Sequence, residues 1–267
     1  MTRAALITEV LAVAREKRIS ANAASLAFYA FNAFVTLLVL IYAAFSAFGT
    51  GNALAGTLQL LTGVGAREVQ ALFERVGSNA AGRRRAVVLA AVIAVWSSLR
   101  LFRAIEGVFA EIYELRTERS FRRQVVDSVV VLVAVTALMV VMAAVGALFV
   151  FRTAGLAWTL LGPVFLWLAL VVLFVPLYSR FSGTDGTVGR ILPGAAVAAA
   201  GWTGSAIALR LYVSVSESVD FYGVVGAVLL VLTWLYVVGG AIILGVVLNA
   251  VLADRVEADR EWYPFWH

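Results

Sequence analysis

The chain has 267 residues, of which 63% are hydrophobic and only 14% are charged, and its formal net charge is +5. A soluble domain carries about 25% charged residues, so this composition excludes an ordinary soluble protein, and the absence of cysteine excludes disulfides and thiolate metal sites. The apolar runs are continuous rather than alternating, which favours membrane helices over a β-barrel. We therefore expect an all-α, polytopic membrane helical bundle.

The first apolar pattern of the chain predicts a helix that lies on the membrane surface. Its residues share one helical face at spacings of three and four, and they are Leu6, Ile7, Val10, Leu11 and Ala14. The charged run 15–18 follows this pattern, and no cleavage site follows a short apolar core, so we expect no signal peptide. A second interfacial helix is predicted in the loop 49–85, from the apolar residues Val69, Leu72, Phe73 and Val76.

Six segments are long and apolar enough to cross a hydrocarbon core, which takes about 20 helical residues. They lie at 24–48, 86–105, 125–150, 155–178, 191–213 and 222–253. Short connections join most of them, and no internal repeat or low-complexity tail is present. The sequence therefore predicts a single integral membrane domain over residues 1–267.

The distribution of Arg and Lys predicts the orientation of these spans, because cytoplasmic loops carry the excess of positive charge. With a cytoplasmic N-terminus, twelve basic residues fall on the inner side: Arg3, Arg15, Lys17, Arg18, Arg116, Arg119, Arg122, Arg123, Arg180, Arg190, Arg255 and Arg260. Six fall on the outer side: Arg67, Arg75, Arg83, Arg84, Arg85 and Arg152. We expect a multi-pass protein of the cell membrane with both termini in the cytoplasm.

Polar residues follow one face of the first predicted span, at spacings of three and four. They are Asn22, Ser25, Tyr29, Asn32 and Thr36. Polar side chains are costly in hydrocarbon unless they meet partners, so this stripe should face the interior of the bundle. Hydrogen bonding between helices and the lining of a cavity explain the stripe equally well.

The second predicted span is unusual because its uncharged run, 86–99, is too short to cross a membrane alone. The helix must continue through Arg100, Arg103 and Glu106. Two interpretations remain open. The arginines can extend to the interface and pair along the helix, or they can form an anion site together with Glu106.

Small residues recur along the fifth and sixth predicted spans. The fifth carries Gly194, Ala198, Gly201 and Ser205, and the sixth carries Gly226, Thr233 and Gly240. Such residues allow helix backbones to approach closely in lipid, so they indicate packing rather than chemistry.

Several of these segments together resemble the YihY/BrkB family of inner-membrane proteins. The run LAFYAFNAFVTLL at 26–38 resembles the family's opening helix, and Trp96-Ser97-Ser98 with the charged segment after it resembles the second-helix motif. Tyr222-Gly223, Thr233-Trp234-Leu235-Tyr236, Gly245 and Asn249 follow in the family's order and spacing. The chain departs from the pattern at Ala33 and Thr36, where the family has Ser and Pro.

The resemblance implies a six-helix membrane protein of the kind described as a transporter or an envelope-associated factor. Some members of the family carry the label ribonuclease BN, but the chemistry argues against a nuclease here. The carboxylates are scattered, the sole histidine is the last residue, and no phosphate-binding glycine loop is present. We therefore expect no enzyme, no cofactor, no metal and no nucleic-acid partner.

Two functions remain. The first is a permease or transporter of lipid or envelope components, and the alternative is a non-transporting structural or assembly factor of the cell membrane. Either function would have membrane lipids as partners and is compatible with a homo-oligomer.

Overall fold

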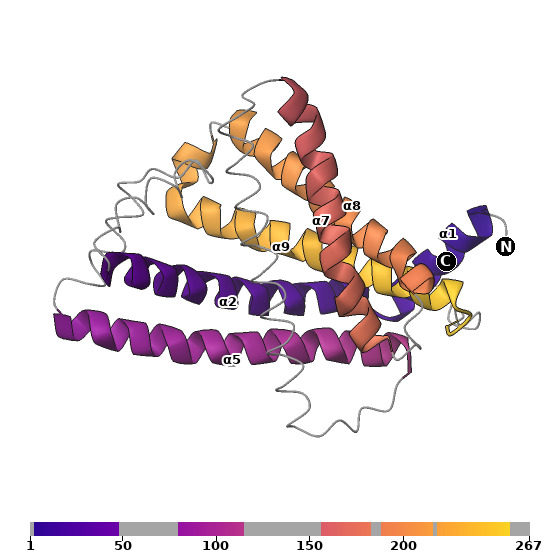
Figure 1. Ribbon diagram of the computed structural model, residues 1–267, viewed down its shortest axis with the longest axis horizontal. Coiled ribbons are helices and arrows are strands. Elements are labelled where there is room, and N and C mark those ends of the chain that lie inside the picture. Colours follow the sequence, from indigo (N-terminus) through magenta and orange to yellow (C-terminus); the bar gives the residue numbers. More distant parts are fainter. Residues whose placement is uncertain (1–2, 48–79, 115–155, 183–187, 216–217, 257–267) are drawn as a thin grey trace, which may run out of the picture. The chain divides into compact units, whose positions relative to one another are not determined.

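The computed structural model describes residues 3–47, 80–114, 156–182, 188–215 and 218–256 (Figure 1). In chain order its helices are α1 (Arg3–Glu16), α2 (Ile19–Ala47), α5 (Ala80–Ile112), α7 (Leu156–Phe181), α8 (Val188–Val215) and α9 (Ser218–Leu252). Every regular element in these described ranges is an α-helix, which confirms the predicted fold class.

Four stretches within these helices are long and apolar enough to cross a membrane: Val87–Ile112, Leu161–Phe181, Val188–Val213 and Val225–Leu252. They contain most of the second, fourth, fifth and sixth predicted spans. The first predicted span begins in α2, whereas the third and the interfacial helix at 69–76 lie outside the described residues. A helical membrane protein is confirmed, and the number six stays a prediction.

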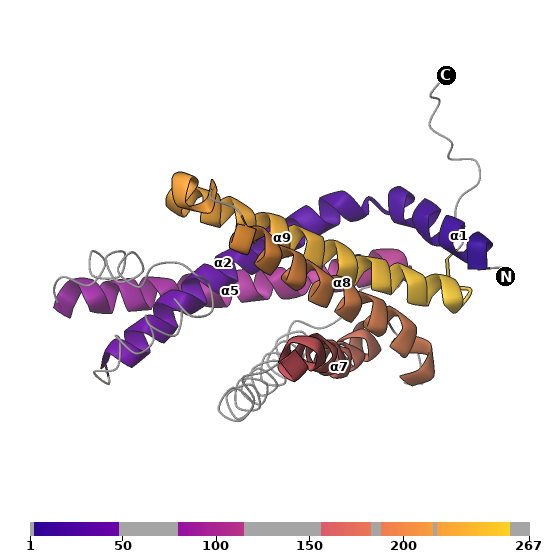
Figure 2. The same cartoon turned by 90° about the horizontal axis from the view of Figure 1, so that it is seen from above.

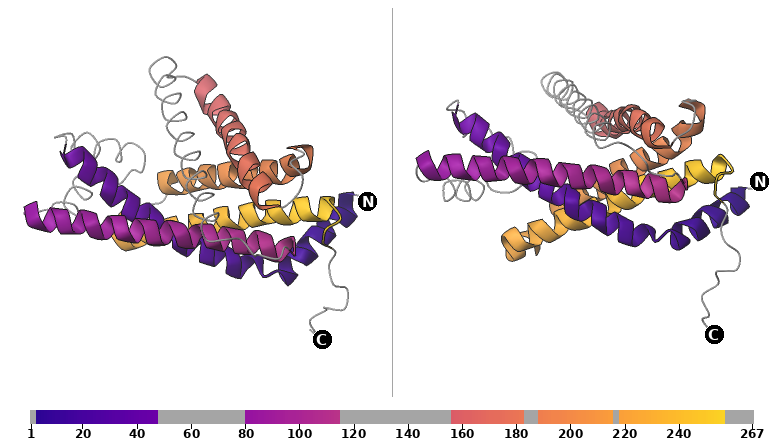
Figure 3. Two further views of the ribbon diagram at one scale, coloured as in Figure 1. Left: turned by 60° about the horizontal axis from the view of Figure 1, so that its bottom comes forward. Right: turned by 90° about the horizontal axis from the view of Figure 1, so that it is seen from below.

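The helix that differs most from its predicted span is α5. The sequence predicts a span at 86–105, yet α5 runs without interruption over 33 residues (Figure 3). At 1.5 Å per residue it is about 50 Å long, which exceeds the roughly 30 Å hydrocarbon core. The charges at its two ends do not terminate it, because Arg and Glu are good helix formers.

The described residues form two compact units, and the single-domain organisation stays a prediction. The first unit contains Met1–Ala27, Phe102–Leu211 and Thr233–His267. The second contains Phe28–Leu101 and Tyr212–Leu232. We describe each unit by itself.

In the first unit, α1 meets the start of α2 at a bend (Figure 2). Arg18 has a φ of 47°, which side chains other than glycine seldom adopt. Its carbonyl accepts the backbone N–H groups of Ala21 and Asn22 at 3.0 and 3.2 Å, which starts α2. Val10, Val13 and Ala14 of α1 are buried, while Ile7 and Leu11 are exposed.

Aromatic side chains join α5 to α7 within the same unit. Phe102 of α5 lies 5.1 Å from Phe181 of α7, centroid to centroid. Phe109, two turns further along α5, lies 5.4 Å from both Tyr178 and Phe181. The Phe102–Phe181 and Phe109–Tyr178 pairs are edge-to-face, and such pairs add about 0.5–1.5 kcal/mol each to the burial itself. This cluster ties the carboxyl ends of α5 and α7 together.

The second unit presents apolar side chains on its surface. On α5, the side chains of Val88, Val92 and Val95 are each more than 60% exposed. Val225 on α9 is 67% exposed. A soluble protein rarely exposes such continuous apolar surface, whereas lipid solvates it at no cost, as expected for a membrane helix.

Candidate functional site

Helices α8 and α9 approach each other closely at Gly194 and Gly245 in the first unit. A Cβ atom built on Gly194 would overlap the carbonyl oxygen of Gly245 and the side-chain amide of Asn249. A Cβ atom on Gly245 would overlap the carbonyl of Gly194 and lie 2.6 Å from the Tyr178 hydroxyl. Only glycine fits at either position, because backbone atoms cannot move aside.

Asn249 of α9 uses this close approach to bind the backbone of α8. Its Oδ1 accepts the Gly194 N–H at 2.7 Å, and its Nδ2 donates to the Ile191 carbonyl at 2.9 Å. The side chain is 2% exposed. Both functions of the amide are therefore satisfied by backbone groups on either side of Pro193.

Tyr178 completes the contact from α7. It is fully buried, and its hydroxyl donates a 2.6 Å hydrogen bond to the Ile242 carbonyl of α9. We name the four residues Tyr178, Gly194, Gly245 and Asn249 the polar junction. It joins three helices through hydrogen bonds, and the two that Asn249 makes are buried.

The structure places the predicted small-residue seams as follows. On α8, Ala198 is fully buried, and a Cβ on Gly201 would lie 2.5 Å from the Ala241 Cβ of α9. The Ser205 hydroxyl donates to the Trp202 carbonyl of its own helix at 2.8 Å. Thus Gly194 and Ala198 form the buried part of the α8 seam, and the half-buried Gly201 contacts α9.

On α9 the grouped residues lie elsewhere. A Cβ on Gly240 would lie 3.9 Å from the Ala23 Cβ of α2, Thr233 is exposed, and Gly226 is half-buried in the second unit. The residues of α9 that contact the glycines of the α8 seam include Ala241, Gly245 and Asn249. These three residues are spaced four apart in the sequence and lie on one face of α9. The predicted seam of Gly226, Thr233 and Gly240, spaced seven apart, lies on another face.

The polar stripe of α2 divides between the two units. In the first unit, the Asn22 amide donates to the Lys17 carbonyl at 3.2 Å and to Glu111 Oε2 of α5 at 3.4 Å, while Ser25 is exposed. In the second unit the half-buried Tyr29 contacts the Phe28 ring, at 5.6 Å between centroids.

The two deepest residues of the stripe bond to their own helix. Asn32 donates to the Phe28 carbonyl at 2.8 Å, and the Thr36 hydroxyl donates to the Asn32 carbonyl at 2.8 Å. These donors therefore need no partner on another helix.

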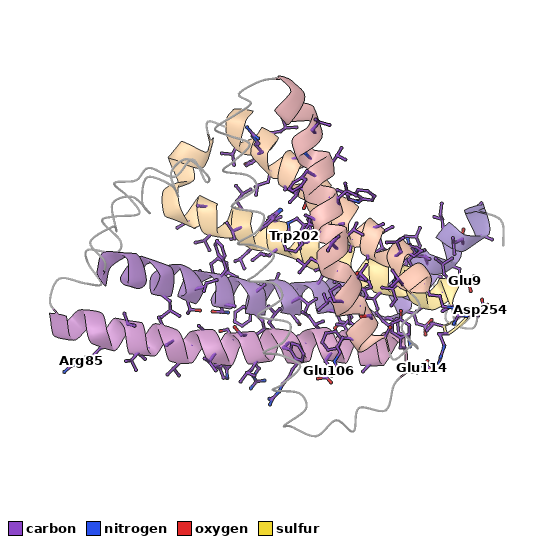
Figure 4. All side chains as sticks on the ribbon, viewed as in Figure 1. Glu9, Arg85, Glu106, Glu114, Trp202 and Asp254 are labelled. Carbon is purple, nitrogen blue, oxygen red and sulfur yellow. The ribbon has the colours of Figure 1, made fainter. Side chains whose placement is uncertain are left out.

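The charged residues of α5 differ in burial. Arg100 and Arg103 are exposed, whereas Glu106 is only 7% exposed. Figure 4 shows Glu106 toward the carboxyl end of α5, with Arg85 near its start. The Arg100 guanidinium lies 5.4 Å from the centroid of the Trp96 ring, one turn nearer the amino end of the helix. This is a cation–π contact.

A group of charged and polar contacts surrounds the carboxyl end of α5. Lys17 Nζ lies 3.6 Å from Glu114 Oε1. Burial raises the pKa of Tyr113 to about 12, and the nearby Arg255 opposes that rise. Glu114 and Asp254 have positive φ values of 53° and 51°, where α5 and α9 end. These contacts tie the helix ends of the first unit to one another.

Three buried polar atoms within the described part of the chain make no hydrogen bond there: Ser97 Oγ, Thr203 Oγ1 and Trp234 Nε1. The Trp234 ring packs edge-on against Trp202 at 5.8 Å. Among the same residues, no three His, Cys, Asp or Glu side chains are grouped closely enough to hold a metal ion. The groups that these described residues offer to a ligand are therefore hydrogen-bonding and charged side chains.

Comparison with known proteins gives one match. The family model described as virulence factor BrkB matches residues 10–264, nearly the whole chain. No curated protein and no solved structure matches the chain. The family match agrees with the long apolar helices and their lipid-compatible surfaces. The chain belongs to the virulence factor BrkB family of integral membrane proteins.

Proposed function

We propose that this protein is a transporter for an anionic amphiphile of the membrane or envelope, and that the arginines of α5 receive the anion. The family and the apolar helices support a membrane protein. The transport activity and the kind of substrate are inferred from the chemistry of α5.

The observation that carries the proposal is the direction of Arg100. Side chains on a helix point toward its amino end, and the Arg100 guanidinium lies over Trp96 in that direction. The apolar part of the exposed face, which includes Val92 and Val95, lies on the same side. Extension to the interface would place the charge toward the carboxyl end of α5, whereas the contact with Trp96 places it toward the amino end. This contact therefore favours an anion-receptive role over snorkelling.

The cost of this arrangement is the second argument. Arg100 is exposed within the apolar stretch Val87–Ile112. An arginine at the centre of a membrane helix costs about 2.5–3.5 kcal/mol on insertion scales. A phosphate or carboxylate group that binds the guanidinium in two places offsets that cost. Arg103, one turn further along the exposed face, adds a second positive charge.

The proposal is tested by lipid translocation in vesicles. The purified protein is reconstituted in phosphatidylcholine vesicles with fluorescently labelled phosphatidylglycerol or labelled phosphatidylcholine, and dithionite reduces the label in the outer leaflet. We expect the protein to speed loss of the inner-leaflet phosphatidylglycerol signal. Arg100→Gln should slow it about tenfold, equivalent to ~1.4 kcal/mol, and Arg100→Lys should restore only part of it.

The matched control is Arg210→Gln, which removes an exposed arginine from another candidate span, on α8. It should leave translocation unchanged. If the folded parent protein moves neither lipid faster than protein-free vesicles do, transport of such amphiphiles is wrong. If Arg100→Gln and Arg210→Gln behave alike, the role given to Arg100 is wrong.

The second candidate is a non-transporting structural or assembly factor. The observation in its favour is the polar junction, where glycine backbones touch and both the Oδ1 and the Nδ2 of Asn249 are hydrogen-bonded to α8. Such packing suits a rigid scaffold. This function would leave vesicle translocation at the protein-free rate in every variant.

The proposal has further parts that follow from the charge and composition of the chain. We propose that the protein is not an enzyme and does not bind nucleic acid, that membrane lipids are its partners, and that it can form homo-oligomers. We also propose that it lies in the cell membrane with both termini in the cytoplasm. Reporter fusions after Arg18 and Ala258 should both report the cytoplasmic side.

A further inference from the structure

Pro193 interrupts the hydrogen-bond ladder of α8 in its second turn. A proline has no N–H to donate, and its ring crowds the carbonyl four residues earlier, here that of Gly189. The turn that carries Arg190 is therefore joined to the rest of α8 by fewer hydrogen bonds than a regular helix has. Gly194, the next residue, adds backbone freedom at the same point.

Asn249 bridges this weak point from another helix. Its amide accepts from Gly194 N–H at 2.7 Å, beyond the proline, and donates to Ile191 C=O at 2.9 Å, before it. A side-chain amide can do both at once, because its nitrogen donates while its oxygen accepts. The contact thus holds the two sides of the interruption in one geometry.

The backbone groups that Asn249 binds have other partners available. In an uninterrupted helix Gly194 N–H bonds to the Arg190 carbonyl, and the Ile191 carbonyl accepts from Ala195 N–H. Release of the amide therefore leaves neither group without a partner on its own chain. Gly194 and Gly245 also present no side chains that would interlock and oppose a pivot.

We propose that Pro193 and Gly194 form a hinge in α8 and that Asn249 is the clamp that holds the hinge closed. When the amide is released, the segment 188–192 bends relative to the remainder of α8. Arg190, which is exposed, moves with this segment. The hinge is a conformational device that operates whether the protein transports or assembles, so its test does not depend on either function.

The test measures the bend within α8 by the distance between two spin labels. The chain has no cysteine, so Gly189→Cys and Gly204→Cys provide two unique attachment points. Both positions have open space, since nothing lies within 4 Å of a Cβ built there. Along a straight helix they are about 22 Å apart, which suits pulsed electron spin resonance in lipid nanodiscs.

We expect one narrow distance distribution in the parent protein. Asn249→Leu, which removes both hydrogen bonds, should broaden it and add a shorter population. Pro193→Ala restores an N–H to the helix, so the double variant Asn249→Leu with Pro193→Ala should be narrow again. That rescue is the result that a merely structural role for Asn249 would not produce.

An unchanged distribution in Asn249→Leu would show that the amide clamps nothing. Equal broadening with and without Pro193→Ala would show a general loss of packing instead of a hinge. If Asn249→Leu does not fold, Asn249→Ala serves in its place, because it removes the same hydrogen bonds without adding a bulky apolar side chain. The same comparison with Pro193→Ala then decides the matter.

Discussion

Two asparagines in apolar helices of this protein satisfy their hydrogen bonds in different ways. Asn249 is 2% exposed and binds two backbone groups of another helix, α8. Asn32 is half-buried and donates to the carbonyl of Phe28, one turn earlier in its own helix. The same side chain thus fixes the position of a neighbouring helix in one region and needs no neighbour in the other.

The comparison shows that a polar residue in a membrane helix is not by itself evidence of contact between helices. An amide that reaches its own backbone offsets its cost in lipid without help. The close approach of Gly194 and Gly245 is what allows Asn249 to reach across. Two predictions test whether the region around Asn249 depends on its neighbours as the contacts indicate, and a third tests the exposed side of α1.

The largest effect is expected at Gly194. Gly194→Ala should lower the free energy of unfolding by about 3 kcal/mol, because the added methyl group meets backbone atoms of Gly245 as well as Asn249. Gly201→Ala should cost less, about 1–2 kcal/mol, since the only close atom is the Ala241 methyl group, at 2.5 Å. Unfolding of the purified variants by sodium dodecyl sulfate measures both effects.

The control in this series is Gly204→Ala, because nothing lies within 4 Å of a Cβ built at Gly204. Alanine is the better helix former, so this variant should be more stable than the parent by about 0.5–1 kcal/mol. A ranking in which Gly204→Ala is as harmful as Gly194→Ala would contradict the contact between α8 and α9.

The second prediction concerns the two asparagines themselves. Asn249→Leu should lower the free energy of unfolding by about 1–3 kcal/mol, since it removes two buried hydrogen bonds between α8 and α9. Asn32→Leu should change it by less than about 0.5 kcal/mol, because the Phe28 carbonyl keeps its place in the helical ladder. Thermal melting in one detergent compares them directly, and equal losses would show that Asn32 also binds another helix.

The smallest effect is expected at α1, which is packed on one side only. Val13 is fully buried, whereas Ile7 and Leu11 are 61% and 50% exposed. We expect these two side chains to enter the lipid interface, assisted by the basic residues Arg15 and Arg18. A bimane label at Leu11→Cys should be quenched by doxyl lipids more than a label at Ala5→Cys, which lies elsewhere around the helix.

The opposite pattern is expected with aqueous iodide, which should quench the label at Ala5→Cys more strongly. If iodide quenches both labels equally and doxyl lipids quench neither, α1 does not lie on lipid. Disulfide-linked dimers of Leu11→Cys would indicate that a second copy of the chain covers this stripe.

Much of the fold followed from the sequence. Long apolar runs predicted helices in membrane, and α5, α7, α8 and α9 contain the runs expected of them. The limits of α5 did not follow, because hydropathy reports where lipid ends, while helix propensity lets Arg and Glu continue the helix beyond it. The partners of the polar stripe and of the small-residue seams did not follow either, because the spacing of residues along one helix does not specify which helix they face.

What the sequence by itself determined is the solvent of this protein and the secondary structure that this solvent demands. Both depend on local properties, because each apolar helix satisfies its own backbone hydrogen bonds in lipid. The tertiary structure alone decided that Asn249 meets the Pro193 interruption and that Asn32 bonds to its own helix. Many pairings of small and polar faces are compatible with the same spacing, so the choice among them rests on which helices touch.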